Sequence, residues 1–578
     1  SKCPGPTKLA MSEASQENKG RPASAWNLAA NPIFRRYCKS QLRPISTGIW
    51  IVTVLVVITF VFLAIYIGTT NVGQKTDIQG ARLAMIGVLA VQGLLLMLIG
   101  TGATTLAYVR EADEKITDYQ RLTPMTPLAK VFGYLFGPSI RSYLLVALTM
   151  PFAIFCIVKG QIPMVAVAQS YTIFFVSGIL YHLTGLLAGT VLKRKLMAGI
   201  LSMGLVFCIN FVLPAILTRS GYKFLFYTTV WPVLQLHGSG MILEDREGEK
   251  FRGREELEAF NESSQSVDFF AFEIPTFTFS LVVQGFLVFT VALIIWRKWK
   301  GENMHLLGKN FSLIVFAGIL VLFLGTSLPL MDSGQIFPSM STEFGRNYMR
   351  PTGTQATLAE GMGVAAACGA VTLIIANILI QMITPSRDGF IRGLRRADKV
   401  GRTRARFGSD PGSALWHTII IALLGASAWF WFTNNLIESK WYPEKSLPGF
   451  APTVMAAIFV FAAICFCATL QMFGKGILWL GMLFAWIVPL LAAGICFISD
   501  QYIAGIYLTS PSPFGAFFNS LAVLLDAPEF ENLKHVKTAF WIWVAIYALF
   551  TTILVAVMQS RQAHLRQLVL NESKEEND

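Results

Sequence analysis

Residues 108–143 read YVREADEKITDYQRLTPMTPLAKVFGYLFGPSIRSY and lie between two strongly apolar segments. The stretch is charged at first, then short and proline-punctuated at 121–127, then amphipathic, and Gly137-Pro138 ends its last helix. It is too polar for a membrane span and too short for a soluble domain. We therefore predict a cytoplasmic lever between two transmembrane helices, and a lever implies a partner that pushes it.

The rest of the chain has the composition of a membrane protein. Its 578 residues are 54% hydrophobic and 14% charged, whereas soluble domains are about 25% charged. Apolar runs of about 20 residues recur, which is the length that crosses a bilayer, and backbone groups in a bilayer must be satisfied within each segment. We predict an all-α polytopic membrane protein of about twelve transmembrane helices. The expected spans are 48–68, 83–108, 142–158, 163–191, 197–217, 275–296, 311–331, 361–382, 414–434, 451–472, 477–498 and 538–559.

Positive charges give the orientation. If the N and C termini are both cytoplasmic, 32 of the 47 Lys and Arg residues lie on the cytoplasmic side. Six of the others are in one outer loop, 218–274, and long loops translocate largely regardless of charge. A topology shifted by one span would reverse this bias. We therefore expect cytoplasmic termini.

Two six-span halves are expected, because Leu122-Thr-Pro124 after the second span is matched by Ile383-Thr-Pro385 after the eighth. Outer segments 227–232 and 507–515 also occupy matching places before the sixth and twelfth spans. We expect disorder at 1–30, no cleaved signal peptide, and a basic amphipathic surface helix that starts at Asn31-Pro32. The predicted domains are 1–47, with that helix; 48–300, the first half with its outer loop; 301–559, the second half with a basic cytoplasmic loop at 383–413; and 560–578, a cytoplasmic tail.

Several functions are excluded by what the sequence lacks. The net charge of +13 is explained by an excess of Lys and Arg on one side of the membrane, so no nucleic acid partner is expected. The eight cysteines have no metal or disulfide spacing, and the histidines do not pair for haem. No phosphate-binding loop occurs, so the chain is not expected to hydrolyse ATP. We predict no catalytic residues, no metal and no cofactor in this chain.

Two groups of residues leave alternatives open. The basic loop is either a lipid-anchoring cluster or a docking surface for an acidic groove. Polar residues within the spans either form hydrogen bonds between helices or line a pathway for a greasy cargo. Ionisable residues are almost absent from the span centres, which favours an external energy source over ion coupling. The candidates for the pathway are His182, Asn210 and Gln284.

The first half resembles the membrane permeases of type-2 ATP-binding-cassette exporters, mainly over residues 31–310. Segment 31–36 (NPIFRR) looks like the surface helix of that family, 118–135 (DYQRLTPMTPLAKVFGYL) like its first cytoplasmic loop, and 267–276 (VDFFAFEIPT) like the start of its last span. Family members often carry a glycine just before Leu-Thr-Pro, which is absent here, and the second half keeps only one proline of the motif.

The resemblance implies a permease subunit that couples a separate cytoplasmic ATP-binding-cassette ATPase, which carries ATP and Mg, to export across the bacterial inner membrane. Membrane lipids, other membrane subunits or a second copy are further expected partners. The alternatives are a non-transporting scaffold subunit of a larger membrane complex and an intramembrane enzyme or redox subunit. The implied coupling residues are Arg121, Leu122, Thr123, Pro124, Met125, Thr126, Pro127 and Leu128 in the first loop, and Thr384, Pro385, Arg387, Arg392, Arg395 and Arg396 in the second.

Overall fold

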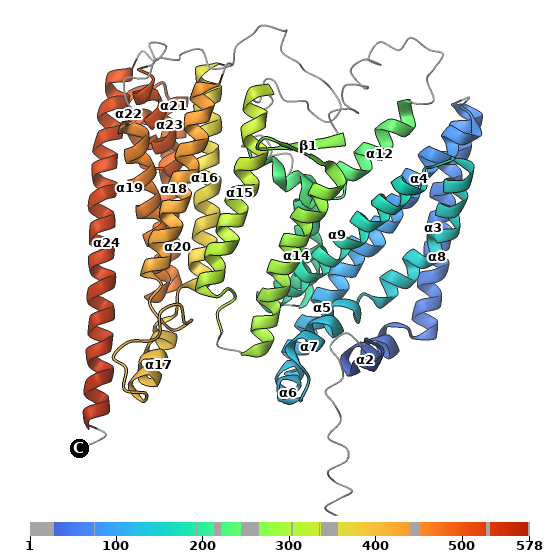
Figure 1. Cartoon of the computed structure of the whole chain (residues 1–578), viewed down its shortest axis with the longest axis horizontal. Coiled ribbons are helices and arrows are strands. Elements are labelled where there is room, and N and C mark those ends of the chain that lie inside the picture. Colours follow the sequence, from blue (N-terminus) through green and yellow to red (C-terminus); the bar gives the residue numbers. More distant parts are fainter. Residues whose placement is uncertain are drawn as a thin grey trace, which may run out of the picture. The chain divides into compact units, whose positions relative to one another are not determined.

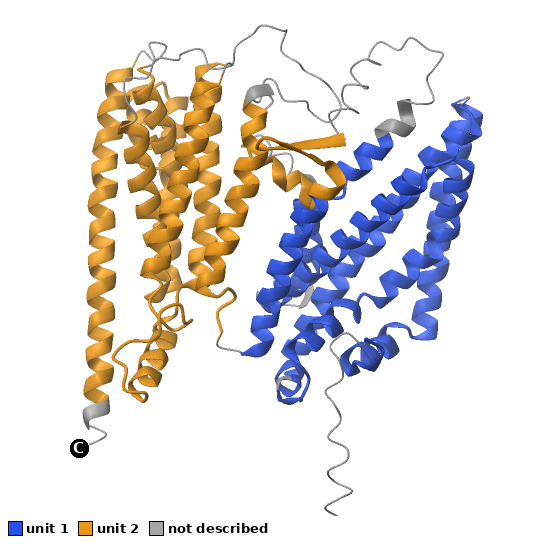
Figure 2. Cartoon of the chain, viewed as in Figure 1, with its two compact units in different colours: residues 1–209, 230–261, 280–302 blue, residues 210–229, 262–279, 303–578 orange. Residues whose placement is uncertain are grey.

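The computed structural model describes residues 28–73, 75–191, 195–212, 221–243, 265–301, 304–333, 336, 357–439, 451–526 and 532–575. In these ranges the chain is helical apart from one two-stranded hairpin. It forms two compact units, which Figure 2 colours separately. Unit 1 comprises 1–209, 230–261 and 280–302, and unit 2 comprises 210–229, 262–279 and 303–578. The main break lies two residues from the predicted boundary between the halves.

Unit 1 contains the surface helix, the first spans and the predicted lever (Figure 1). Its elements are η1 (Leu28–Ala30), α2 (Pro32–Gln41), α3 (Pro44–Ile67), η2 (Gly68–Val72), α4 (Asp77–Gly93), η3 (Leu94–Ile99), α5 (Gly100–Asp113), α6 (Ile116–Leu122), α7 (Pro127–Phe136), α8 (Ile140–Lys159), α9 (Met164–Val191), α10 (Lys195–Phe207), the start of η4 (Cys208–Val212), α12 (Trp231–Leu243) and most of α14 (Thr276–Lys300).

Unit 2 contains the later spans and the basic loop. Its elements are η6 (Lys223–Thr228), β1 (Ser266–Phe269), β2 (Phe272–Pro275), α15 (Lys309–Ser333), α16 (Leu358–Ile383), α17 (Arg387–Asp398), α18 (Leu415–Glu438), α19 (Ala451–Ala468), η8 (Thr469–Met472), α20 (Lys475–Met482), η9 (Leu483–Ile487), α21 (Val488–Ile498), α22 (Tyr502–Thr509), α23 (Pro513–Leu524) and α24 (Leu533–Glu575).

Eleven helices within the described residues are long and apolar enough to cross a membrane. They coincide with eleven of the twelve predicted spans, which confirms an all-α polytopic membrane protein. The fifth predicted span, 197–217, is represented by α10 and η4, whose described part ends at Val212. The exact number of spans and the cytoplasmic position of the termini stay predictions.

Two segments predicted to be outer loops contain helices of their own. The stretch 502–524, predicted as part of the last outer loop, forms α22 and α23, and α23 is largely buried against α16, α19 and α24. It begins at Pro513, where the Ser512 hydroxyl accepts a hydrogen bond from the Gly515 amide. The matching stretch of the predicted outer loop 218–274 forms η6 and α12.

The β1–β2 hairpin is a small exception to the predicted all-α fold. Phe270 at its turn has a left-handed backbone, and its amide donates to the Gly325 carbonyl of α15 at 2.8 Å. A Cβ atom on Gly325 would lie 2.1 Å from the Phe269 ring. The hairpin can therefore pack this closely against α15 only because Gly325 has no side chain. Hydropathy alone does not predict such a contact. Most of the acidic part of this outer loop, 244–264, lies outside the described residues.

Candidate functional site

The candidate site is the lever of unit 1, which we define as α6, α7 and the turn between them, residues 116–136. α5 ends at Asp113, and Lys115 turns the chain with a left-handed backbone (φ 57°) before α6 starts. α6 ends at Leu122, before Pro124. α7 then begins at Pro127, with the Thr126 hydroxyl accepting from the Ala129 amide. The predicted proline-punctuated turn and amphipathic helix are both present.

Glu111, near the end of α5, is the hub of this region. Its side chain is only 8% exposed, although charged groups are rarely buried without partners. One carboxylate oxygen accepts from the Arg36 guanidinium and the Tyr37 hydroxyl, both on α2. The other accepts from the Tyr134 hydroxyl of α7 and from Nε2 of Gln120 in α6 at 3.0 Å. One carboxylate therefore holds four helices together.

The tyrosines of this hub remain neutral donors. Burial raises the pKa of the Tyr37 hydroxyl well above its usual range, and the Glu111 charge raises it further. The same two causes, in the same order, raise the pKa of the Tyr134 hydroxyl. Each hydroxyl therefore keeps its proton and can donate it to the carboxylate at every physiological pH.

An aromatic stack joins the lever to the end of α14. The Tyr134 ring lies on the Trp299 ring with centroids 5.3 Å apart, and Tyr37 and Tyr108 meet Tyr134 edge-on at 6.0 and 5.7 Å. Lys130 is buried beneath the stack, where its ammonium donates to the Gln120 carbonyl at 2.6 Å and lies 5.7 Å from the centre of the Trp299 ring. Aromatic pairs of this kind add about 0.5–1.5 kcal/mol beyond their area.

α2 packs directly on α7. Asn31 caps α2, and its amide donates to the Ala129 carbonyl of α7 at 2.6 Å. A Cβ atom on Gly133 would lie 2.8 Å from Cβ of Ile33, so only glycine permits this approach. The helix predicted to start at Asn31-Pro32 is present, and its position on the cytoplasmic membrane surface stays a prediction. The apolar face of α2, which includes Tyr37, packs against the lever.

Part of the lever exposes large apolar side chains to solvent. Tyr119 is 73% exposed and Leu122 is 84% exposed, although neither is on a candidate span. Among the other coupling residues implied by the resemblance, Thr123, Pro124 and Thr126 are exposed, Met125, Pro127 and Leu128 are partly buried, and the Arg121 side chain lies outside the described part. Met125 packs against the lever core. We call Tyr119, Leu122, Thr123 and Pro124 the tip.

A series of side-chain contacts runs from the lever into the spans. Phe136 at the end of α7 meets Tyr143 of α8, with centroids 6.1 Å apart. The Tyr143 hydroxyl lies 3.4 Å from Nδ1 of His182 on α9, and Nε2 of His182 lies 2.8 Å from the Leu96 carbonyl. Leu96 belongs to η3, a π-helical segment within the same long helix that leads into the lever, and π-bulges are frequent at functional sites. A Cβ atom on Gly100 would lie 2.4 Å from Nε2 of His182, so the ring fills the groove beside η3.

Two of the three predicted pathway residues, His182 and Gln284, form hydrogen bonds within unit 1. His182 is part of the series above, and Gln284 accepts from the Ser177 hydroxyl at 3.0 Å. Gln92, a similar polar residue, bonds to Thr149 and Tyr171 at 3.0 Å each. These contacts are of the interhelical type. The Asn210 side chain lies outside the described residues.

The second predicted coupling loop differs from the first. Thr384 and Pro385 are buried, and the Thr384 hydroxyl donates to the Ile380 carbonyl at 2.7 Å. They are therefore not accessible to a partner in this structure, whereas Thr123 and Pro124 are. Arg387, Arg392, Arg395 and Arg396 are exposed on α17, so this part of the second loop presents charge where the first presents Leu122 and Pro124.

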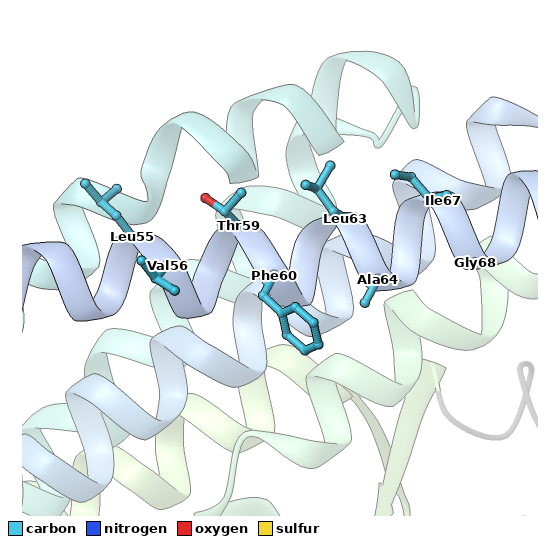
Figure 3. Close-up of a pocket in the computed structure, with 8 residues that line it drawn as sticks. All are labelled: Leu55, Val56, Thr59, Phe60, Leu63, Ala64, Ile67 and Gly68. Carbon is cyan, nitrogen blue, oxygen red and sulfur yellow. The ribbon is translucent and has the colours of Figure 1, made fainter.

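Three further features do not point to a reaction site in the described residues. An open depression of about 640 Å³ beside α3 is lined by apolar side chains together with Thr59 and Gly68 (Figure 3). Such a lining is expected for a surface that faces lipid. Within the described residues, no group of three or more His, Cys, Asp and Glu side chains is arranged to hold a metal ion. The cysteines described there are free, and four of the seven are buried.

Comparison of the chain with models of protein families, with curated proteins and with solved structures finds no match. The site must therefore be interpreted from its own geometry. Sequence reasoning located the lever and Leu122, but it missed Tyr119, Glu111 and Gln120. The available signal for Glu111 was its place as the first acid after the predicted span 83–108, ahead of Asp113 and Glu114.

Proposed function

We propose that the chain is the permease subunit of an ATP-driven exporter in the bacterial inner membrane, and that a separate ATP-binding-cassette ATPase binds the tip. The observation that carries the proposal is the exposure of Tyr119 and Leu122 outside the candidate spans. Burying one such side chain in a partner contributes roughly 1.5–3 kcal/mol. Apolar anchors surrounded by polar residues are typical of protein interfaces.

The contacts that hold the lever to its neighbouring helices would let it transmit a force applied at the tip. Glu111 ties the lever to α2 and α5, and the aromatic stack ties it to α14. A push on the tip would therefore move several helices as one body. The contacts through Tyr143 and His182 reach η3, where a π-helical segment can absorb a change in helical register. Cargo would then pass along spans displaced by this movement.

The experiment is purification of the chain in mild detergent with mass-spectrometric identification of accompanying proteins. The double variant Tyr119→Asp/Leu122→Asp should lose an ATP-binding-cassette ATPase that accompanies the unaltered chain. Val72→Asp is the matched control. Val72 is also 84% exposed, but it lies beyond the end of α3 that is remote from α2. Retention of the ATPase by the double variant would refute the proposal.

A scaffold subunit is the second candidate. It is favoured by the hydrogen bonds that already occupy His182, Gln284 and Gln92 in the core of unit 1. The two functions differ in one measurable respect. An exporter's partner ATPase should hydrolyse ATP at a rate that changes when the tip is substituted, whereas a scaffold should leave that rate unchanged.

A further inference from the structure

The strongest concentration of charge in unit 2 lies on α17 and the chain that follows it. All the cations between residues 387 and 406 are exposed, and only two acids, Asp388 and Asp398, lie in the same stretch. We call these cations the cationic face; its members are Arg387, Arg392, Arg395, Arg396, Lys399, Arg402, Arg404 and Arg406.

The apolar side of α17 is already covered by protein. Phe390 and Leu394 are buried in a cluster with Met558, Leu565 and Val569 of α24. A helix that lies on a bilayer needs lipid to cover its apolar face. α17 needs no lipid for this purpose, because α24 covers its apolar face. The cationic residues of α17 lie on its opposite side.

α17 follows α24 away from the apolar span, beside the C-terminal part of α24 (Figure 1). The polar sequence of α24 starts at Gln559, and Arg395 pairs with Glu572 at 2.8 Å. Thirteen residues of helix separate Gln559 from Glu572, which corresponds to about 20 Å along the axis. Charges at a membrane surface are screened over about 8 Å at physiological salt, so a headgroup layer at the level of Gln559 would attract Arg395 only weakly.

The ion pair that Arg395 of the cationic face forms with α24 is accessible to solvent. The Arg395–Glu572 pair is half exposed, and such pairs contribute about 0–1 kcal/mol. Nε of Arg566 in α24 has no hydrogen-bond partner within the described residues. An anionic group beside it would supply one.

The far side of the loop is fixed in place. Lys309 is fully buried, and its ammonium donates to the carbonyls of Ser409 and Gly412 at 2.8 and 2.6 Å. This contact anchors the end of the loop to α15. The loop also exposes Val400 and Phe407, which add apolar surface among the cations. Preorganised, mixed surfaces of this kind favour protein partners.

We propose that the cationic face is a docking surface for an acidic surface of another protein, with Val400 and Phe407 as its apolar contacts. This inference goes beyond the proposed function, because it concerns unit 2 and does not require the tip. Its chemistry also differs, since the tip binds through apolar burial, whereas the cationic face selects charge and accelerates association at low salt.

The test uses the full chain in nanodiscs of phosphatidylcholine and a fluorescent poly-glutamate peptide as the acidic probe, with affinity measured by anisotropy. The test variant is Arg396→Glu/Lys399→Glu/Arg402→Glu. The control variant, Arg35→Glu/Lys39→Glu/Arg43→Glu, makes the same change in charge at exposed positions at or next to α2. We expect the test variant to weaken binding at least about tenfold, equivalent to ~1.4 kcal/mol, and the control variant to change it less than about twofold.

Equal losses in both variants would show that only net charge attracts the probe and would overturn the proposal. A second arm counts the phosphatidylglycerol that each variant retains from mixed nanodiscs. Loss of this lipid only from the test variant, with probe binding unchanged, would identify lipid as the occupant and would also overturn it. If the reversed variant fails to fold, Lys399→Gln/Arg402→Gln replaces it and should weaken probe binding in the same direction. The Tyr119→Asp/Leu122→Asp variant should bind the probe normally, which keeps this result separate from the proposed function.

Discussion

Replacing Glu111 with glutamine should release the surface helix from the lever. The substitution keeps the shape of the side chain but removes its charge, and it places an NH₂ group against hydroxyl and amide donors. Hydrogen bonds to a charged group contribute about 1.5–3 kcal/mol each, and removing one partner of a buried ion pair costs about 3–5 kcal/mol. Arg36 is 42% exposed and can regain water, so we expect a loss of about 2–4 kcal/mol, a value that straddles these two ranges.

This magnitude can be measured as local opening. A loss of about 2–4 kcal/mol raises the equilibrium for opening roughly 30- to 700-fold. Hydrogen–deuterium exchange of the amides in α2, α6 and α7 should accelerate accordingly, while exchange in α16 should not change. The measurement needs only the purified protein and no knowledge of its cargo.

Glu114→Gln is the matched control. Glu114 is three residues further along, pairs with Arg110 at 3.0 Å within the same helical region, and both side chains are substantially exposed. Such a pair contributes about 0.3–0.5 kcal/mol, so exchange should change less than about threefold. If Glu111→Gln and Glu114→Gln gave the same exchange, or if neither altered α2, the assignment of Glu111 as the hub would be refuted.

Three further predictions concern the same region. Gly133→Val should separate α2 from α7, because a Cβ there would lie 2.8 Å from Ile33; proteolysis within α2 should increase, whereas Gly48→Val, with open space around it, should have no effect. Lys115→Val should destabilise the α5–α6 turn by about 1–2 kcal/mol, since a β-branched residue at φ 57° is strained, and Lys115→Gly should be tolerated in the same exchange measurement. Because the pKa values of Tyr37 and Tyr134 are raised, the stability from their hydroxyls is complete below about pH 10, the usual tyrosine value, and is lost as the pH rises above it; α2 exchange, corrected for the intrinsic rate, should be constant from neutral pH to that point, and an earlier loss would contradict the assignment.

Most of the fold follows from hydropathy and punctuation. Long apolar runs require helices in a bilayer, and Pro124, Pro127 and Gly137-Pro138 mark the ends of the lever helices. α22 and α23 were not predicted, because the short apolar stretches between Tyr502 and Leu524 resemble a loop until tertiary packing covers them. The hairpin at 266–275 depends on Gly325, which is about fifty residues away in the sequence.

The candidate site was predictable only in part, for the same reason. Leu122 is exposed because of its place at the end of a short helix, and the local sequence indicates this. Glu111 is buried because of partners on three other helices, which no local pattern contains. Thr384-Pro385 repeats the letters of Thr123-Pro124, but its surroundings bury it, so an identical motif has a different exposure.

The most direct measurement of the central claim is photocrosslinking in living cells from a benzophenone amino acid introduced in place of Leu122, followed by mass-spectrometric identification of the crosslinked protein. The account predicts an ATP-binding-cassette ATPase at this position and none when the same group replaces Val72. Crosslinks from position 122 to lipid alone, or to proteins on the outer side of the membrane, would contradict it.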